Sequence, residues 1–396
     1  MPTDPWLAII GLGEDGPDGL NDASRKALAG AEVIFGAPRH LALIGADARG
    51  QAWPEPFALE PLLALRGRPV AALVSGDPFW HGAGGSLAAH LQPHEWRAFP
   101  VASSFSLAAA RLGWRLEDVC CLGLHAAPFE RLVPHLADKQ RLICLVRDGA
   151  APAALAQWLV DHQFGNSTLH VLERLGGPDE RMSRCTAAGF DVSNVSAPVC
   201  VAVELHGANG FLLTPGRPDD EFAHDGQITR SAIRAVTLAA LAPRAGQVLW
   251  DLGAGSGSIS VEWCLAHQAN RAHAVELKPE RIVNIAANSR AFALEERLHI
   301  HSGSSPLMLT ALPPADAVFV GGGLSEELLA LLWANTSTGT RIVVNSVTLE
   351  SDALLTQQAG RFGGGLCRFA MSSAEPLGNL RGWKAARPIT QWIVVR

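Results

Sequence analysis

The chain has 396 residues, of which 48% are hydrophobic and 18% charged, so it is long enough to bury two substantial cores. A formal net charge of −6 provides no basic stripe for binding phosphates, which argues against a nucleic-acid partner. The first five residues carry neither a basic region nor an apolar stretch, and no apolar run approaches the roughly 18 residues of a membrane span. We therefore expect a cytoplasmic protein with no membrane partner.

The first half of the chain alternates strand-like runs with helix-like segments, a pattern typical of α/β proteins. The segments lie at 6–10, 24–31, 33–35, 70–74 and 86–91, followed by 142–146, a helix over 152–162, and strands over 167–173 and 198–204. The proline at the start of the helix over 152–162 suits its first turn.

Glycine and proline interrupt this pattern between His206 and Pro218, which predicts a linker over 206–218 between domains at 1–205 and 219–396. The second domain begins with a helix over 229–242, a strand over 247–251, a helix over 258–267 and a strand over 272–276. That order is a βαβ unit, and further strands are predicted at 298–301, 317–320, 341–345 and 389–395.

A glycine-rich turn follows the first strand of the second domain, with the sequence Asp251-Leu252-Gly253-Ala254-Gly255-Ser256-Gly257. Glycines let the backbone approach a ligand closely, and Glu276 at the end of the next strand can accept both hydroxyl protons of a ribose. The alternative is a dinucleotide site, but Ser258 occupies the place of its third glycine. The spacing favours S-adenosylmethionine over a dinucleotide.

A different glycine-rich turn near the start, Gly11-Leu12-Gly13-Glu14-Asp15-Gly16, matches the dinucleotide pattern letter for letter. The residues after it postpone the helix to about Ser24, so no helix N-terminus opens at the turn to receive a pyrophosphate. The second strand ends in Gly36 rather than in an acid, which also disfavours a dinucleotide.

The second domain resembles the decarboxylating C15-methyltransferases of cobalamin biosynthesis, which have a Rossmann-like class I fold with a mostly parallel, doubly wound sheet. The motifs that carry this resemblance are the Asp251 turn, Val275-Glu276, Gly226-Gln227-Ile228-Thr229 and Phe319-Val320-Gly321-Gly322-Gly323. The last segment stands where methyltransferases of nucleic-acid amines have an Asn/Asp-Pro-Pro-aromatic motif, which disfavours base methylation.

The first domain resembles the tetrapyrrole methylase family, whose fold has two α/β subdomains. The shared segments are the Gly11 turn, Val74-Ser75-Gly76-Asp77-Pro78, Ser103-Ser104-Phe105 and Leu172-Glu173-Arg174-Leu175-Gly176. Together the two halves resemble the decarboxylating C5,15-methyltransferases that convert precorrin-6Y (precorrin-6B) to precorrin-8X, and this resemblance covers nearly the whole chain.

The resemblance implies one S-adenosylmethionine site in each domain, two per chain, and a tetrapyrrole substrate. The residues that it assigns to the donor are Gly11, Gly13, Asp15, Gly76, Asp77, Ser104 and His125 in the first domain, and Thr229, Asp251, Gly253, Gly255, Gly257, Glu276, Gly303 and Ser304 in the second. Ser304 replaces the acid usual in the family, so the adenine contact there is expected to involve the backbone. Relatives form dimers or tetramers, which implies a homo-oligomer.

The carboxylates of such a substrate call for cationic or hydrogen-bonding partners. Candidates are Arg39, His81, Arg341, Asn345 and Arg381, the last in a glycine-broken loop. For each arginine the alternative is a solvated surface charge, for His81 and His125 a hydrogen-bonded packing role, and for Asn345 a cap of the following turn.

We expect no metal site. The seven cysteines include no CxxC pair, and His299 and His301 share one side of a strand without a third ligand nearby in the sequence. Two other hypotheses stay open at this point, a dinucleotide-dependent oxidoreductase that uses the Gly11 turn and a carrier that binds a tetrapyrrole without methylating it.

Overall fold

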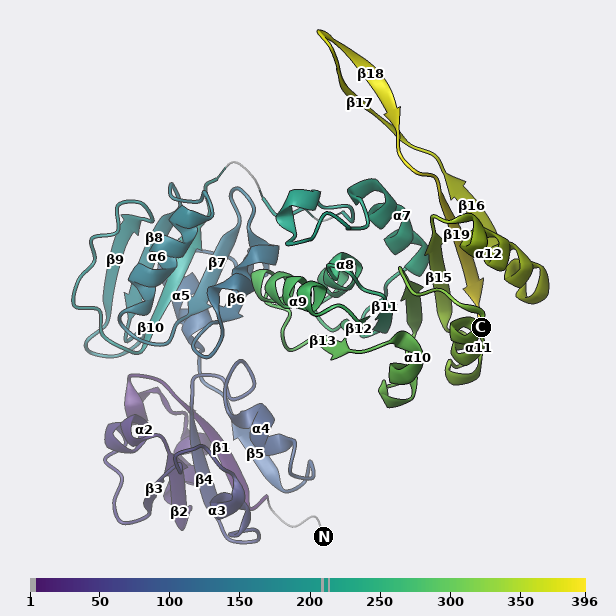
Figure 1. The fold of residues 1–396 in the computed structure, drawn as a ribbon. Helices are drawn as coiled ribbons and strands as arrows, with labels where there is room; N and C mark the ends of the chain where they lie inside the picture. The colour runs from purple at the N-terminus through teal and green to yellow at the C-terminus, as the bar shows by residue number, and fades with distance from the viewer. Residues whose placement is uncertain (1–4, 208–209, 213) are drawn as a thin grey trace. The chain divides into compact units, whose positions relative to one another are not determined.

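A computed structural model describes residues 5–207, 210–212 and 214–396, and the chain divides into two compact units, Met1–Gly210 and Phe211–Arg396 (Figure 1). We call them unit 1 and unit 2 and describe each by itself. The division falls inside the segment 206–218, of which positions 208, 209 and 213 lie outside the described residues.

Unit 1 begins with a five-stranded sheet in the order β3-β2-β4-β1-β5, in which each strand runs parallel to its neighbours. Its central strands β1 and β4 are almost wholly buried, as expected for a parallel sheet that is covered on both faces. The strands are β1 (Leu7–Leu12), β2 (Val33–Gly36), β3 (Gly50–Ala52), β4 (Val70–Ser75) and β5 (Trp96–Phe99), and the helices are α1 (Asp22–Ala29), α2 (Pro38–Leu43), α3 (Glu60–Leu63) and α4 (Gly84–Ala88).

The turn after β1 leads into a short 3-10 helix, η1 (Gly16–Gly19), before α1 starts. Asn21 caps α1, because its side chain accepts a hydrogen bond from the backbone N–H of Ser24 at 2.9 Å. No α-helix therefore begins at the glycine turn, as the sequence predicts.

The second half of unit 1 is a five-stranded mixed sheet in the order β6-β7-β10-β8-β9, in which only β6 and β7 pair in parallel. The strands are β6 (Val119–Gly123), β7 (Arg141–Leu145), β8 (Thr168–Glu173), β9 (Arg181–Thr186) and β10 (Val199–Glu204). Helices α5 (Ser104–Leu112) and α6 (Ala151–Asp161) pack on it through Phe105, Ala108, Leu155 and Leu159, all buried. Unit 1 thus has two α/β halves, as predicted.

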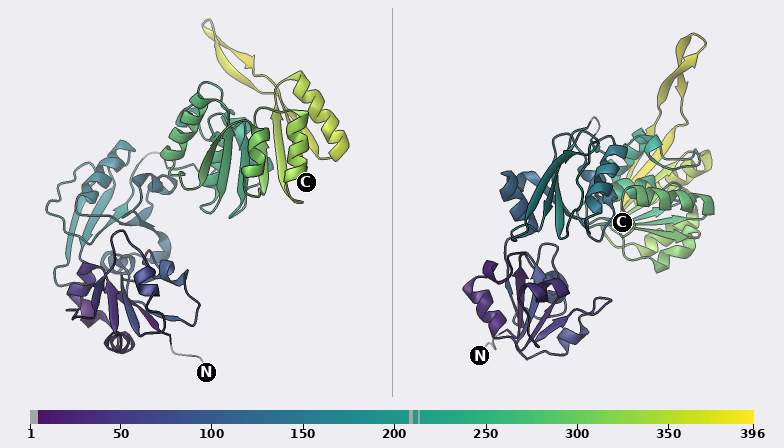
Figure 2. Two further views of the ribbon diagram at one scale, coloured as in Figure 1. Left: turned by 60° about the horizontal axis from the view of Figure 1, so that its bottom comes forward. Right: turned by 90° about the vertical axis from the view of Figure 1, so that its left-hand side faces the viewer.

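Unit 2 is a doubly wound α/β sheet in the order β13-β12-β11-β14-β15-β19-β16, with helices on both faces (Figures 1 and 2). The strands from β13 to β15 pair in parallel, and β19 is antiparallel to β15. The strands are β11 (Val248–Leu252), β12 (Arg271–Glu276), β13 (Leu298–Ser302), β14 (Ala317–Val320), β15 (Arg341–Ser346), β16 (Gly365–Phe369) and β19 (Ile389–Val395), and the helices are α7 (Ser231–Leu241), α8 (Ser258–Ala266), α9 (Pro279–Ala291), α10 (Ser305–Met308), α11 (Glu326–Asn335) and α12 (Leu349–Phe362). The mostly parallel Rossmann-like fold predicted for this half is confirmed.

The chain between β16 and β19 forms a two-stranded hairpin, β17 (Ser372–Leu377) and β18 (Leu380–Ala385), which extends from the rest of unit 2 (Figure 1). The prediction of a glycine-broken loop around Arg381 is therefore wrong, because Leu377 pairs with Leu380 across a two-residue turn that holds Gly378 at φ +61°.

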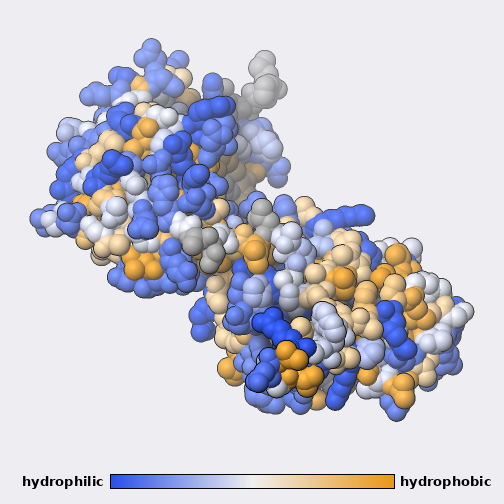
Figure 3. All heavy atoms as spheres, turned by 90° about the horizontal axis from the view of Figure 1, so that it is seen from above, coloured by the Kyte–Doolittle hydropathy of each residue, from blue (hydrophilic) through white to orange (hydrophobic). Residues whose placement is uncertain are grey.

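Hydrophilic and apolar side chains are intermixed on the face of the molecule drawn in Figure 3. Among the described residues, none of the helices is long and apolar enough to cross a membrane.

Candidate functional site

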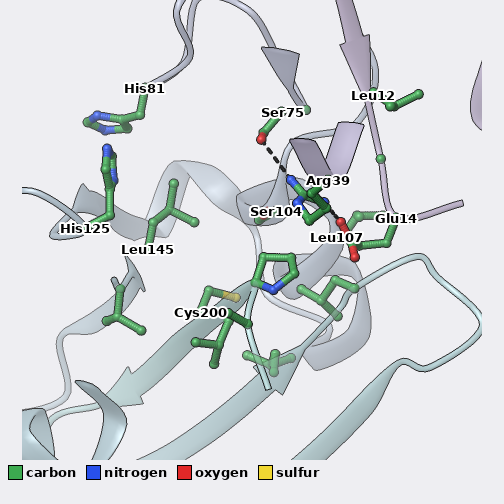
Figure 4. A pocket seen from close by; sticks show the side chains of 18 of the residues that line it. Leu12, Glu14, Arg39, Ser75, His81, Ser104, Leu107, His125, Leu145 and Cys200 are labelled. Atoms are coloured by element: carbon green, nitrogen blue, oxygen red, sulfur yellow. Dashed lines mark hydrogen bonds and ion pairs between the residues drawn. The ribbon is translucent and has the colours of Figure 1, made fainter. Parts of the chain in front are cut away.

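A cavity of about 370 Å³ lies in unit 1, where the carboxyl ends of β1 and β4 face the second sheet (Figure 4). The first half contributes Leu12, Gly13, Ser75 and Gly76, and the second half contributes residues of β7, β8 and β10. Ligands of open α/β sheets bind at the carboxyl ends of parallel strands, so this cavity is the candidate site of unit 1.

The glycine at position 11 is required by a close approach of two backbones. A Cβ at Gly11 would lie 2.0 Å from the carbonyl oxygen of Gly76 and 3.0 Å from the backbone nitrogen of Val101. Gly76 itself has φ +57°, a conformation that favours glycine. Both glycines therefore bring the turns after β1 and β4 together at the edge of the cavity.

Four of the donor residues predicted for unit 1 line the cavity, namely Gly13, Gly76, Ser104 and His125. The other three support the turns instead of lining it: Gly11 by the approach described above, Asp15 by folding its carboxylate onto Gly19, and Asp77 by accepting a hydrogen bond from the N–H of Phe79 at 2.8 Å.

Arg39 lies in the cavity within a network of polar side chains (Figure 4). Its guanidinium pairs with Glu14 and donates to the Oγ of Ser75 at 3.2 Å and to the Nε2 of His40 at 2.9 Å. Burial and the neighbouring Arg39 lower the pKa of His40 to about 4, so this imidazole is neutral and can accept that hydrogen bond. The network fixes the direction of the Arg39 guanidinium.

His81 and His125 lie close to each other at another part of the same cavity (Figure 4). Arg147 also lines the cavity, and its Nε donates to the backbone carbonyl of His125 at 3.4 Å. Sequence reasoning missed Arg147, although its place directly after a predicted strand was a usable signal.

A second cavity, of about 310 Å³, lies in unit 2 at the carboxyl ends of the neighbouring strands β11 and β14. This point is the topological switch of the sheet, because the chain runs to one side from β11 to β13 and to the other from β14 onward. The predicted residues Gly253, Glu276, Gly303 and Ser304 line it, together with Gly321–Gly323 after β14.

The glycine turn after β11 needs its glycines for conformation and, at Gly253, also for space. Gly253, Gly255 and Gly257 have φ values of +68°, +60° and +72°. A Cβ at Gly253 would lie 2.7–2.8 Å from three backbone atoms of Gly322, and one at Gly257 would lie 2.9 Å from the side chain of Ile285. Gly255 and Gly257 do not line the cavity but shape the turn that does.

Two acids stand at the ends of neighbouring strands in unit 2. Glu276 is buried, and its carboxylate accepts hydrogen bonds from the backbone N–H groups of Gly255, Leu277 and Lys278 at 2.8–3.0 Å. Asp251 is fully buried, and its Oδ2 accepts from the N–H and hydroxyl of Ser260 at 3.2 and 2.6 Å. Burial raises the pKa of Asp251 to about 6, and its Oδ1 has no partner among the described residues.

The segment before α7 is held next to the glycine turn by a buried arginine. Arg234 is fully buried, donates to the Oε1 of Glu262 at 2.6 Å and also bonds the backbone carbonyl of Thr229. The carbonyl of Gln227, two residues before Thr229, lies 3.9 Å from the Cβ position of Gly255. Thr229 does not line the cavity, but this arginine fixes its backbone beside the turn.

Three substrate-contact candidates of unit 2 do not line its cavity. Arg341 is at the amino end of β15, the opposite edge of the sheet, and donates to the carbonyl of Leu241 and to Gln247, both at 2.6 Å. It is a structural residue, so the prediction of a substrate contact there is not supported. The reason is the direction of β15: Arg341 lies at its amino end, whereas ligands bind at the carboxyl ends of parallel strands, near Asn345.

Asn345 takes part in a hydrogen-bond network instead of capping a turn. Its Nδ2 donates to the Oγ1 of Thr237 at 2.9 Å, and its Oδ1 accepts from the Nε2 of Gln391 at the same distance. Arg381 is exposed on the hairpin strand β18, opposite Pro376.

A third histidine joins the pair that the sequence places on one strand. His273 on β12 pairs in register with His299, and its Nδ1 lies 2.9 Å from the Nε2 of His301. Burial and the neighbouring imidazoles lower the pKa of His273 to about 4. Among the described residues, no cluster of three or more His, Cys, Asp or Glu side chains has an arrangement that could hold a metal ion.

Two family models divide the chain in the same places as its two folds. The model for tetrapyrrole (corrin/porphyrin) methylases matches residues 7–191, and the model for a precorrin methyltransferase domain matches residues 220–396. A "Precorrin-6Y C(5,15)-methyltransferase [decarboxylating]" from Sinorhizobium sp is 42% identical over 396 residues, which cover 98% of this chain and 96% of that protein. The chain belongs to this family.

Another precorrin-6Y C(5,15)-methyltransferase, from Mycobacterium tuberculosis, is 37% identical over 405 residues and covers 98% of this chain and 100% of its own length. A solved structure of the C-terminal domain of the Rhodobacter capsulatus enzyme is 53% identical, covers 47% of this chain and 100% of its own, and has a TM-score of 0.46. The predicted enzyme class, a methyltransferase of cobalamin biosynthesis, is confirmed, and membership in the family implies S-adenosylmethionine as methyl donor.

The residues of both cavities fit this donor. In unit 2 the cavity is lined by bare backbone at Gly253 and by the carboxylate of Glu276, which three backbone N–H groups hold in place. In unit 1 the turns after β1 and β4 present bare backbone at Gly13 and Gly76.

Proposed function

We propose that this chain methylates precorrin-6Y at C5 and C15 and removes carbon dioxide from the acetate side chain of ring C, giving precorrin-8X. S-adenosylmethionine binds once in each unit, two molecules per chain. The observation that supports this most directly is the presence of two separate cavities, each formed by a glycine turn at the carboxyl ends of parallel strands and each within the range of one family model.

We assign methylation of C5 to unit 1 and methylation of C15, with the decarboxylation, to unit 2. In support, a protein of Pyrobaculum calidifontis named "Probable cobalt-precorrin-6B C(15)-methyltransferase (decarboxylating)" is 37% identical over 155 residues, which cover 38% of this chain and 79% of that protein. Its match is the size of one unit, and its name contains only the C15 activity.

The sulfonium of the donor supplies a methyl group that is already activated, so the protein chiefly has to align reactants and exclude water. In unit 2 the carboxylate of Glu276, held by three backbone N–H groups, is oriented to accept the ribose hydroxyls. The turn that contains Gly253, packed against Gly322, carries the rest of the molecule against bare backbone. In unit 1 Gly13, Gly76 and Ser104 do the same work, and Arg39 and Arg147 meet substrate carboxylates.

The decarboxylation needs an acceptor for the electron pair that stays behind when carbon dioxide leaves. The conjugated macrocycle itself can take up that pair. The task of unit 2 is then to hold the ring C acetate in a fixed orientation, which the cavity at the ends of β11 and β14 can do through backbone groups of Gly253 and Gly321–Gly323.

The test uses the full chain. Titration with S-adenosylhomocysteine should give two molecules bound per chain, and incubation with precorrin-6Y and donor should give a product two methyl groups heavier and one carbon dioxide lighter. A stoichiometry of one would leave one unit without a donor site. Binding of NAD(P) without binding of S-adenosylhomocysteine would support the oxidoreductase alternative, and binding of the tetrapyrrole with no change in its mass would support the carrier.

A homo-oligomer, dimer or tetramer, remains a prediction from the resemblance, and analytical ultracentrifugation of the full chain tests it.

A further inference from the structure

Methyl transfer to a ring carbon requires a base that takes up the proton released by the macrocycle. The donor arrives as a cation and leaves as a neutral thioether, so its positive charge passes to the macrocycle with the methyl group. The macrocycle returns to its former charge only when it releases a proton. A basic side chain at the site can accept this proton directly.

The cavity of unit 1 holds few groups that can do so. The ionisable side chains among the described residues that line it are Glu14, Arg39, His81, His125, Arg147 and Cys200. Both arginines are permanent cations. Glu14 is paired with Arg39, and burial raises the pKa of the Cys200 thiol to about 12, so that thiol stays protonated near neutral pH. The two imidazoles are the bases that remain.

His81 is held in an unusual position. It has φ +59°, in the left-handed region that a side chain of this kind seldom adopts, and such strain concentrates at functional sites. Its imidazole rests against Gly123 at the end of β6, where a Cβ would lie only 2.7 Å from the Nδ1 of His81. A residue of the first half thus reaches the second half of unit 1 over a bare glycine, and its ring comes close to that of His125 in the cavity (Figure 4).

We propose that His81 is a catalytic residue of unit 1 and accepts the proton that the macrocycle releases during methylation at C5. The proposal rests on the function proposed above for unit 1. It assigns His125 a supporting role beside His81.

The step is balanced without a further reactant. The C5–CH3 bond forms from an electron pair of the macrocycle as the S–CH3 bond breaks, and the pair of that bond stays on sulfur. The proton leaves the macrocycle for an imidazole nitrogen of His81, and the pair that bound it restores the conjugation of the ring. Nothing is oxidised or reduced.

The surroundings of His81 keep it ready to accept a proton. His81 is exposed as a residue, but partial burial of its imidazole, together with His125 on the turn after β6 and Arg131 on the following 3-10 helix η3 (Phe129–His135), lowers its pKa. The imidazole is therefore neutral at neutral pH. These neighbours come from the second half of unit 1, and Phe105 of α5 covers the ring from another side, with ring centroids 5.7 Å apart.

The experiment compares His81→Gly and His81→Gln in the full chain, with ¹³C-methyl donor and NMR detection of each methylated carbon. Glycine suits φ +59°, so His81→Gly removes the base and relieves the strained backbone, and this variant is expected to fold. We expect both variants to slow C5 methylation at least about 100-fold, the usual effect of losing a general base. Binding of S-adenosylhomocysteine should be unchanged.

Two further readouts separate proton transfer from a structural role. Added imidazole should restore part of the C5 rate in His81→Gly, since it can occupy the space left by the side chain, and it should not help His81→Gln. The wild-type C5 rate should fall as the pH decreases through the pKa of His81, which lies below the ordinary histidine value of 6.5, and this dependence should disappear in His81→Gln. The matched control is His90→Gln, which removes an exposed histidine of the same half that does not line the cavity.

The methylation at C15 serves as an internal reference. If it proceeds independently, it should keep its wild-type rate in the His81 variants; if it depends on the C5 methyl group, imidazole should restore both. A C5 rate within about threefold of wild type in His81→Gly would overturn the proposal, and so would a loss of the C5 rate without rescue by imidazole. A wild-type chain that forms no doubly methylated product would instead contradict the proposed function itself.

Discussion

The contact between the glycine turn of unit 2 and Gly322 makes a sharp prediction for Gly253→Ala. The added Cβ would lie 2.7 Å from the carbonyl oxygen of Gly322, and 2.8 Å from both its Cα and its nitrogen. These are backbone atoms of the turn after β14, so the clash cannot be relieved by a side-chain rotation. Either the turn with Gly253 or the turn with Gly322 has to move.

The magnitude follows from two costs. An alanine at φ +68° costs about 1 kcal/mol relative to glycine, and an overpacked contact between two backbones costs about 1–3 kcal/mol more. The sum, about 2–4 kcal/mol, corresponds to a decrease of roughly 4–15 °C in the midpoint of thermal unfolding for a unit of this size.

Gly255→Ala is the matched control, because Gly255 belongs to the same turn and has φ +60°. The nearest atom to its added Cβ is the carbonyl oxygen of Gln227, at 3.9 Å, which is an ordinary contact. This variant therefore bears only the conformational cost of about 1 kcal/mol, or roughly 2–4 °C.

Differential scanning calorimetry and titration with S-adenosylhomocysteine check both variants. Gly253→Ala should lose the donor site of unit 2, so that one molecule binds per chain in place of two, while the site in unit 1 keeps its affinity. Equal destabilisation of the two variants, or a Gly253→Ala protein that unfolds at the wild-type temperature, would refute the steric argument.

Three further predictions concern unit 2. Asp251→Asn should stabilise the ligand-free chain at pH 8 by about 1–3 kcal/mol, because a carboxyl whose pKa rises from 3.8 to about 6 on folding costs stability above that pKa. The gain over wild type should vanish as the pH falls through 6 towards 4. Donor binding should weaken in the same variant. His273→Gln should reduce the loss of stability in acid. The unfolded state takes up a proton on His273 below pH 6.5 and the folded state only near pH 4, so the wild-type chain loses about 1–2 kcal/mol of stability across that window once the partial exposure of His273 is considered. Urea unfolding at pH 7 and pH 4.5 measures the difference between variant and wild type. Arg341→Met should lower stability by about 1–2 kcal/mol through the lost hydrogen bonds to Leu241 and Gln247 but leave the KM for substrate unchanged, and a raised KM would return Arg341 to the substrate site.

Most strands and helices could be predicted from the sequence, because the patterns that indicate them lie within short stretches of residues. The apolar run over 70–74 became β4, the run over 317–320 became β14, and the helix predicted over 258–267 became α8. The hairpin of β17 and β18 was missed, because its strands are almost fully exposed and show no alternation of apolar and polar residues that would mark a buried face.

The candidate site residues differ in the same way: those positioned by neighbouring residues could be predicted, and those positioned by distant partners could not. Gly253 and Glu276 could be placed from the sequence, since a turn and a strand end are set by neighbouring residues. The substrate contact predicted for Arg341 is not supported, because Arg341 begins its strand and ligands bind at the carboxyl ends of parallel strands. Asn345 was no easier, since its partners Thr237 and Gln391 are far away in the chain.

By itself the sequence determined that this protein has two α/β units, each with its own glycine turn. These features depend on residue spacing and on the conformational freedom of glycine, and both can be read from residues that are close together in the chain. Only the tertiary structure decided that His81 meets His125 over Gly123, and that Arg234 of α7 pairs with Glu262 of α8. Such contacts join segments that are distant in the chain, and their geometry is fixed by the packing of sheets and helices, which no spacing in the sequence records.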